Sequence, residues 1–191
     1  KGSMEIKLDA KDYEKLFHGV KLAHFNIVNW SRDLLKIAKE NGCVISADIQ
    51  DIVSLDDPYR LDYIENADYL FFSSVNFLSP EKAAEYFLRI NPDLKIISGL
   101  GEKGCFYSDK NISKYFKAVD IEDRVIDTTG AGDSLAAGFL VARIFEGLSL
   151  TESILWGQIA ARYICSKRIY EERIIERKLL IDYFARYRDS L

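Results

Sequence analysis

A chain of 191 residues, 48% of them hydrophobic, is long and apolar enough to form one domain with a sizeable core. Its 30 acidic and 26 basic side chains give a formal charge of −4, and no basic tract stands out, which disfavours nucleic acid as the main partner. No apolar run approaches the ~20 residues of a membrane span and no signal peptide is recognisable, so we expect a cytoplasmic protein that does not bind membranes.

The amino-terminal residues and the cysteines add two expectations. Gly2-Ser3-Met4 reads like the remnant of a cleaved tag followed by a start codon, so residues 1–3 are interpreted as a tag remnant and 1–191 as a single domain. Whether the gene product is short or a fragment of a longer chain stays open. Cys43, Cys105 and Cys165 are odd in number, far apart and without metal-ligand spacing, which predicts reduced thiols in the core.

Short apolar strands alternate with helices through the first hundred residues. Ser31 is predicted to cap the first helix, which ends near Asn41-Gly42, and Ser79-Pro80 is predicted to begin the third. The alternation predicts an α/β fold, a three-layer sandwich with a mostly parallel sheet and helices on both faces. The strands are expected at 21–28, 43–48, 69–72 and 94–98, and the helices at 31–42, 55–66 and from 79 onwards.

The rest of the chain is predicted to be mostly helical. Ser149 and Glu152 have the spacing of a capping box, which fixes the start of one helix. Residues 171–190 form an amphipathic pattern. An antiparallel pair of strands is expected at 104–109 and 113–119, followed by helices at 135–146, 149–166 and 171–190; the apolar face of the last helix comprises Ile174, Ile175, Leu179, Tyr183, Phe184 and Tyr187.

The stretch 127–134, Asp-Thr-Thr-Gly-Ala-Gly-Asp-Ser, carries the clearest functional signal, and it opens a predicted helix. Gly130 and Gly132 let the backbone turn tightly and approach a ligand. The amides of these two residues and of Ala131 then lie at a helix N-terminus, which favours an anion such as phosphate. Asp133 is placed to take a proton from a hydroxyl that attacks a phosphate. The alternative is an ordinary strand-to-helix turn with an aspartate near its cap.

This octet closely resembles the signature of the ribokinase-like (PfkB) family of sugar and nucleoside kinases. The resemblance implies that Asp133 is the catalytic base, that the backbone of Gly130, Ala131 and Gly132 forms the anion hole, and that ATP and Mg²⁺ are used. It also suggests a monovalent cation near Asp127 and Thr129.

The resemblance covers about residues 21–166 and corresponds to the carboxyl-terminal half of a family member. The family's Gly-Gly-Asn sugar-binding strand and the β lid over the acceptor are not recognisable before Lys21. The sequence therefore indicates a nucleotide site and a base, with little visible machinery for choosing an acceptor.

Residues 99–104, Gly-Leu-Gly-Glu-Lys-Gly, come directly off a predicted strand and resemble the family's Thr-x-Gly-x-x-Gly nucleotide loop. Taken alone they also fit a plain hairpin-like turn. Gly99 stands where the family has Thr, which removes a hydroxyl. Gln158 falls where many family members carry an Asn beside the nucleotide, although it also fits a solvated position on a helix. The residues assigned to nucleotide binding are Gly99, Gly101, Glu102, Lys103, Gly104 and Gln158.

Three other segments depart from the family pattern. Ser73 and Asn76 stand where the family has Asn-x-x-Glu, a motif that serves magnesium and phosphate, and an amide does not replace the charge of a carboxylate. Residues 47–51, Ala-Asp-Ile-Gln-Asp, resemble the family's Asp-Pro-Asn strand end but retain only Asp48. Residues 166–170 replace the Gly-Ala segment that borders the adenine, so the nucleotide preference stays open.

Two functions are compatible with these residues. The first is an ATP-dependent kinase that phosphorylates a hydroxyl of a small sugar-like or nucleoside acceptor. The alternative is a non-catalytic or regulatory nucleotide-binding protein derived from this family, which the departures favour and the retained Asp133 disfavours.

The strand at 21–28 would leave an apolar edge exposed on the predicted sheet. We therefore expect a homodimer, or a partner chain, that covers this edge. The other possibility is that Tyr13, Leu16 and Phe17 fold back over it.

Overall fold

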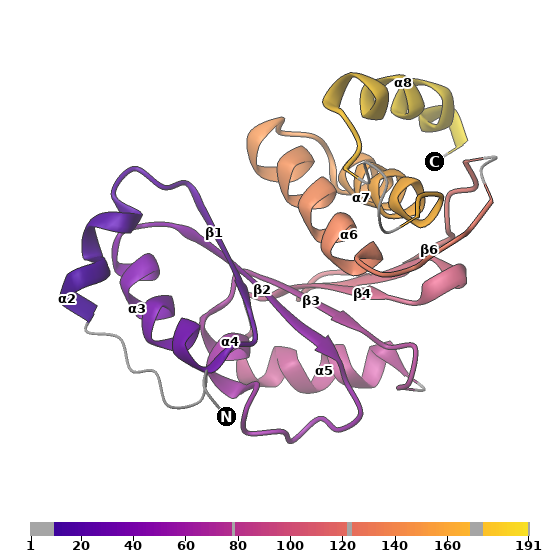
Figure 1. Ribbon diagram of the computed structural model, residues 1–191. Helices are drawn as coiled ribbons and strands as arrows, with labels where there is room; N and C mark the ends of the chain where they lie inside the picture. The colour runs from indigo at the N-terminus through magenta and orange to yellow at the C-terminus, as the bar shows by residue number, and fades with distance from the viewer. Residues whose placement is uncertain (1–9, 78, 122–123, 169–173, 191) are drawn as a thin grey trace. The chain divides into compact units, whose positions relative to one another are not determined.

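The computed structural model describes residues 10–77, 79–121, 124–168 and 174–190. Within them the chain forms two compact units (Figure 1), the first comprising residues 10–101 and 105–115 and the second comprising 102–104 and the residues from 116 onwards. The single domain expected over 1–191 stays a prediction. The interpretation of residues 1–3 as a tag remnant lies outside the described residues.

A six-stranded sheet, with its strands in sequence order, forms the first unit up to residue 115. The first four strands run parallel, and the fifth runs antiparallel to the fourth. A short turn links the last two strands, where the Asp109 amide donates to the Ile112 carbonyl at 2.9 Å. So short a connection joins only antiparallel neighbours, which confirms the predicted hairpin. The strands are β1 (Leu22–Asn26), β2 (Val44–Asp51), β3 (Tyr69–Ser73), β4 (Lys95–Gly99), β5 (Cys105–Ser108) and β6 (Ser113–Phe116).

Helices α3 (Arg32–Glu40), α4 (Leu61–Asn66) and α5 (Pro80–Ile90) connect the parallel strands. Each of these connections leads from one strand to the next strand of the sheet, always on the same side. Because such crossovers are right-handed, their helices all lie on one face of the sheet, as Figure 1 shows. The core of the first unit lies between this face and the helices. Its fully buried members include Leu35, Ile45, Ile49, Ile52, Tyr63, Leu70, Phe87 and Ile96.

A short amino-terminal segment completes this core. It comprises α2 (Ala10–Tyr13) and a 3₁₀ turn, Glu14–Phe17. The Phe17 ring lies 6.5 Å from the Phe25 ring of β1, measured between centroids, whereas Leu16 is 61% exposed. The segment contributes no strand, so β1 remains the first strand of the sheet.

The second unit consists mainly of α6 (Ala131–Leu140), α7 (Leu150–Cys165) and α8 (Arg177–Tyr187). The backbones of α6 and α7 approach closely, since a Cβ on Gly138 would lie 2.9 Å from the Cα of Gly157. Beyond Leu140 the chain continues as one π-helical turn, Val141–Phe145. A core cluster joins these helices and contains Ala142, Leu155, Trp156, Ile159 and Leu180.

Several sequence predictions are confirmed. The fold is α/β with a mostly parallel sheet. The capping box forms as expected: the Ser149 Oγ accepts the Glu152 amide at 3.3 Å, and the Ser149 amide donates to Glu152 Oε2 at 3.0 Å. Cys43, Cys105 and Cys165 are all buried and are not joined in disulfides.

Two helix starts in the first unit differ from the prediction. Ser31 does not cap α3 with its side chain, because its hydroxyl is buried and donates to the carbonyls of Asn26 and Val28 at 3.0 and 2.9 Å. The helix expected over 55–66 is reduced to α4 at Leu61–Asn66. Pro58 disfavours helical geometry in the residue before it, which delays the start of this helix.

In the second unit two helices differ from the prediction in their bounds. The helix expected over 135–146 begins four residues earlier, at Ala131, because Gly130 provides its N-cap, and it changes to π-helical geometry after Leu140. The helix expected over 171–190 is α8, while residues 171–173 lie outside the described residues. Ile174 precedes α8 and is 82% exposed, so it does not belong to the apolar face assigned to it.

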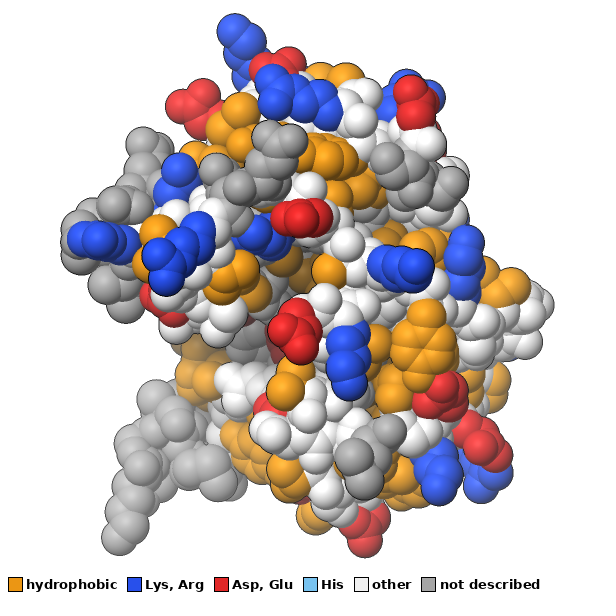
Figure 2. All heavy atoms as spheres, turned by 90° about the vertical axis from the view of Figure 1, so that its right-hand side faces the viewer, with side chains coloured by type: hydrophobic (Ala, Val, Ile, Leu, Met, Phe, Trp, Pro, Cys, Tyr) orange, Lys and Arg blue, Asp and Glu red, His pale blue; other side chains and the backbone are white. Residues whose placement is uncertain are grey.

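Two surface properties bear on possible partners. No helix in the described part of the chain has both the length and the apolarity needed to cross a membrane. On the face drawn in Figure 2, basic and acidic side chains are interspersed, and the coloured atoms of this face form no continuous basic area.

Candidate active site

The predicted phosphate signature folds as the start of α6. Gly130 is the N-cap residue and has a φ of 81°, in the left-handed region that glycine adopts without strain. A Cβ on Gly130 would lie 3.2 Å from the Ile164 Cδ1 of α7. Glycine is therefore favoured at this position by both backbone conformation and space.

The loop that leads into α6 is anchored on the end of α7. The amides of Ile126 and Asp127 both donate to the carbonyl of Cys165, at 2.7 and 3.2 Å. The Asp127 Oδ1 then accepts the Thr129 amide at 2.9 Å. The two residues predicted to lie near a monovalent cation, Asp127 and Thr129, are therefore brought together by a local turn in which one carboxylate oxygen already accepts a backbone amide.

The anion-hole residues and the predicted base share one helical turn. The Ala131 amide donates to the Thr128 carbonyl at 3.1 Å. Gly132 and Asp133 are both exposed, and no atom lies within 4 Å of a Cβ built on Gly132. The expectation that both glycines are needed for a tight turn is therefore wrong for Gly132, which has no positive φ. Its missing Cβ instead leaves open space in front of the helix N-terminus.

Residues 99–104 connect β4 to β5. Gly99 ends β4, Gly101–Lys103 form a 3₁₀ turn, and β5 follows, so the segment is the hairpin-like turn that the sequence also allowed. Gly104 has a φ of 99°, and its Cβ would lie 2.1 Å from the Phe116 carbonyl oxygen. The two units divide within this loop: Gly99 and Gly101 belong to the first, and Glu102 to Gly104 belong to the second.

Gln158 is not a solvated helix residue. It is 8% exposed on α7, and its Nε2 donates to the Phe116 carbonyl at 3.4 Å. The solvated alternative is therefore wrong, and its role beside a nucleotide stays a prediction.

Three parallel strands end in one row within the first unit. Asp51 of β2 is the register partner of Ser73 in β3, and Ser73 is the partner of Gly99 in β4. Ligands of parallel α/β sheets bind outside the carboxyl ends of the strands, which is where this row lies. The next residues are tied to the same place, since the Ser74 amide donates to the Gly99 carbonyl at 3.0 Å.

A bulge in β2 decides which way Asp51 faces. Between Asp48 and Asp51 the strand has one residue more than β3 has between their partners, and Gln50 takes a φ of 60°. Register partners of parallel strands share a face, so the bulge puts Asp51 on the face that carries Asp48. Ile49 and Ile52, both fully buried, point into the core on the other face.

Arg60 holds this bulge in place. Its Nε donates to the Ile49 carbonyl at 3.1 Å, and its Nη2 donates to the Asp51 carbonyl at 3.0 Å, so one guanidinium spans both sides of Gln50. The Gln50 amide donates to Asp48 Oδ1 at 2.7 Å. These three hydrogen bonds support a backbone conformation that a non-glycine residue rarely adopts.

The carboxylate that the bulge presents is only half satisfied. Asp51 Oδ2 accepts the side-chain amide of Asn76 at 2.5 Å. Asp51 Oδ1 is excluded from solvent and has no hydrogen-bond partner among the described residues. Sequence reasoning missed Asp51, Gln50 and Arg60. The signal in the sequence was the spacing of Ile49 and Ile52, which are three residues apart. In a regular strand, residues that face the same side are two residues apart, so this spacing indicates a bulge.

Two observations limit where a ligand would be held. Within the residues that the structure describes, no three His, Cys, Asp or Glu side chains gather into a metal-binding group. A surface pocket of about 250 Å³ lies at the start of β4, the end opposite to Gly99. Its lining residues are Asp93, Lys95, Asp109, Lys110 and Asn111.

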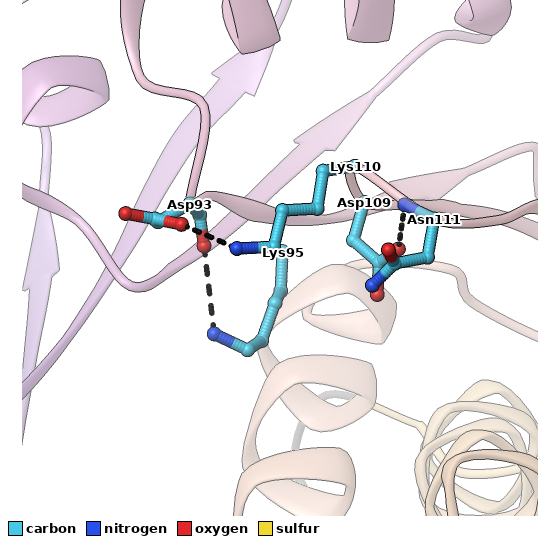
Figure 3. Close-up of a pocket in the computed structure, with 5 residues that line it drawn as sticks. All are labelled: Asp93, Lys95, Asp109, Lys110 and Asn111. Carbon is cyan, nitrogen blue, oxygen red and sulfur yellow. Dashed lines mark hydrogen bonds and ion pairs between the residues drawn. The ribbon is translucent and has the colours of Figure 1, made fainter.

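The charged groups of this pocket already satisfy one another. Figure 3 shows Lys95 and Lys110 reaching the same residue, Asp93, with Lys110 Nζ 2.9 Å from Asp93 Oδ1. The hydrogen bond and charge of Lys110 lower the pKa of Asp93, and Asp93 raises the pKa of Lys110. Asp109 accepts the Asn111 amide at 2.8 Å. We therefore interpret the charged residues of this pocket as stabilising the turns at Asp93 and Asp109, and not as a ligand site.

The sheet order, the start of α6 at Gly130 and the row of strand ends belong to an α/β fold whose candidate ligand sites lie at strand ends and at a helix N-terminus. The "pfkB family carbohydrate kinase" model matches residues 78–170, so the predicted resemblance to that family is confirmed over this part of the chain. The chain is 36% identical over 84 residues to a ribokinase of Haemophilus influenzae and 32% identical over 79 residues to a 2-dehydro-3-deoxygluconokinase of Bacillus subtilis.

Solved structures extend the similarity in fold to nearly the whole chain. A microbiome-derived acarbose kinase superposes on 95% of it with a TM-score of 0.88 and 21% identity. An E. coli structure described as ribokinase II in complex with ATP and Mg²⁺ covers 94% of it with a TM-score of 0.71 and 19% identity. The matches span 61% and 62% of those two chains. The sequence match to the Haemophilus influenzae ribokinase covers 44% of this chain and 26% of that relative. The match to the Bacillus subtilis 2-dehydro-3-deoxygluconokinase covers 41% of this chain and 24% of that relative.

Proposed function

We propose that this chain carries the nucleotide-binding and catalytic part of an ATP-dependent kinase that phosphorylates a hydroxyl of a small sugar-like or nucleoside acceptor. The observation that carries the proposal is the start of α6, where the left-handed Gly130, the open position at Gly132 and the carboxylate of Asp133 share one turn. The family match over residues 78–170 supports the same class of reaction.

The proposed reaction uses a base and an anion site. The Asp133 carboxylate accepts the proton of the acceptor hydroxyl, whose oxygen attacks the γ-phosphorus of ATP. The bond between the γ-phosphorus and the β,γ-bridging oxygen breaks, and ADP leaves. We assign the backbone amides of Gly130, Ala131 and Gly132 to the negative charge on the transferring group, for which the Ala131 amide has to exchange or share its hydrogen bond to the Thr128 carbonyl. Asp133 then returns its proton to solvent.

We assign the nucleotide to the loop between β4 and β5 and to α7. This assignment rests on family resemblance and on the location of Gly99 in the row of strand ends. Mg²⁺, when bound, neutralises the phosphates of the nucleotide. For the monovalent cation we propose Asp127 and Thr129, supported by the turn that joins them. The residues assigned to the nucleotide remain Gly99, Gly101, Glu102, Lys103, Gly104 and Gln158.

The alternative is a nucleotide-binding protein without catalysis. Asn76 and Gly99 favour it, because the first lacks the charge and the second the hydroxyl of the family motifs. The chain also spans only about six-tenths of the similar solved structures. Asp133 disfavours the alternative, since a protein that only binds nucleotide needs the glycines but not the base.

One pair of measurements separates the two functions. ATP binding is measured by isothermal titration calorimetry, and transfer is measured as ADP release and ³¹P NMR of the product with a panel of sugars and nucleosides. Binding together with transfer to at least one acceptor supports the kinase. Binding without transfer to any acceptor supports the alternative, and no binding of ATP contradicts both.

We further propose that a second copy or a partner chain covers β1. β1 is the terminal strand of the sheet, and residues 10–17 contribute helical turns to the core and no strand. A terminal strand offers backbone N–H and C=O groups to another chain. The cytoplasmic location expected from the sequence remains part of this proposal.

A further inference from the structure

We infer that Asp51 supplies the protein carboxylate toward the magnesium ion of the bound nucleotide, a role that the Asn76 amide cannot fill alone. The inference rests on the proposed function, because it assigns a residue to the metal that accompanies ATP. It starts from a structural anomaly in the first unit, the unsatisfied oxygen of Asp51.

A buried carboxylate oxygen without a donor is costly. An ionised oxygen that is kept from water and has no donor is unfavourable, so such atoms are normally paired. Asp51 Oδ1 is excluded from solvent and has no partner in the described part of the chain, while Oδ2 uses the Asn76 amide. A cation compensates for the charge that one neutral amide leaves uncompensated.

The fold maintains this arrangement at a cost. Without the extra residue in β2, alternation would turn residue 51 toward the core side of the sheet. Gln50 is held in the left-handed region, which is strained for a residue other than glycine, and Arg60 donates to the carbonyls of Ile49 and Asp51 on either side of it. Strain of this kind is concentrated at functional sites, and bulges commonly re-aim a side chain next to them.

Asp51 lies beside the loop assigned to the nucleotide. Asp51, Ser73 and Gly99 are successive register partners, so two strand spacings, about 10 Å, separate Asp51 from Gly99. A Cβ on Gly101 would lie 3.6 Å from Val75 Cγ2, which places the loop next to the segment that carries Asn76. These contacts all fall within the first unit.

The small number of protein ligands suits magnesium. Mg²⁺ keeps several waters and is usually held by one or two carboxylates together with substrate phosphates. A group of three acidic or imidazole side chains is therefore not required. The side-chain amide of Asn76 donates through Nδ2, which turns Nδ2 and not Oδ1 toward Asp51 and keeps the amide oxygen available as a second ligand.

Mn²⁺ titration followed by electron paramagnetic resonance tests the metal contact without any turnover. Asp51→Asn removes the charge and keeps the shape, and Asp56→Asn in the exposed loop after β2 is the matched control. We expect Asp51→Asn to weaken Mn²⁺ binding at least about tenfold, Asp56→Asn to leave it unchanged, and Asn76→Asp to strengthen it. Unchanged Mn²⁺ binding in Asp51→Asn, or no Mn²⁺ binding by the parent protein, would overturn the inference.

ADP titrations separate a metal role from a structural one. In Asp51→Asn the affinity for ADP with Mg²⁺ should fall, whereas metal-free ADP should bind as well or better, because a negative charge near the phosphates is gone. Equal losses with and without Mg²⁺ would mean local misfolding and would overturn the inference. If the parent protein binds no ADP under either condition, the proposed function fails. The Mn²⁺ titration alone then tests whether Asp51 contacts a metal ion.

Discussion

Gly130 lies against Ile164, so that a methyl group built on Gly130 would come within 3.2 Å of the Ile164 Cδ1 atom. Two residues further on, a methyl group on Gly132 would meet nothing within 4 Å. The two glycines of one motif thus meet different requirements: conformation and packing for Gly130, and open space at the helix N-terminus for Gly132.

This contrast predicts opposite effects of two alanine substitutions. Gly130→Ala should destabilise the protein by about 1–2 kcal/mol, because alanine is strained at a positive φ. Gly132→Ala should raise the free energy of unfolding by about 0.5 kcal/mol through helix propensity and still weaken ATP binding. Urea unfolding and calorimetric titration with ATP measure the two effects. ATP affinity unchanged in Gly132→Ala would place the anion site elsewhere.

Asp133→Asn tests the base. The side chain is exposed in the first turn of α6, so its replacement by an amide should not disturb packing. We expect ATP affinity within a few-fold of the parent and transfer lowered by on the order of 10²–10⁴. The assay requires an acceptor that the parent protein phosphorylates, and Asp120→Asn, which changes another exposed carboxylate of the same unit, is the control. Parallel losses of binding and transfer would mark a structural role for Asp133.

Gln50 should tolerate glycine and reject valine. Gln50→Gly relieves the left-handed conformation, which offsets the entropy that glycine loses on folding, so its stability should stay within about 1 kcal/mol of the parent. Gln50→Val should lower the free energy of unfolding by about 2 kcal/mol, since β-branched residues are least suited to positive φ. Thermal or urea unfolding checks both variants. A stable valine variant would show that the bulge is not held in this conformation.

The terminal strand predicts self-association or capture of a partner. Sedimentation equilibrium at micromolar concentrations should give a mass above the 21.9 kDa of one chain. Leu22→Lys puts a charge on β1 and should shift the distribution toward the monomer. A mass of 21.9 kDa at every concentration would contradict the homodimer and leave a separate partner chain to be tested.

The sequence by itself determined the class of fold and the position of the signature at the start of a helix. Apolar strands alternating with helices predicted a parallel sheet, because the period of the pattern follows local backbone geometry. The octet at 127–134 and the capping box at Ser149 and Glu152 are local in the same sense. Their hydrogen bonds join residues two to four positions apart, so residue order alone locates them.

Only the tertiary structure decided which residues meet at the ends of the strands. Asp51 and Asn76 are 25 positions apart, and Arg60 reaches back nine residues to the Asp51 carbonyl. Gln158, for which the sequence allowed either a place beside a nucleotide or a solvated position, is buried, and its side chain donates to the carbonyl of Phe116, 42 positions away. Such contacts depend on the register between strands and on a one-residue bulge. A shift of one residue sends a side chain to the other face, and local propensity does not specify it.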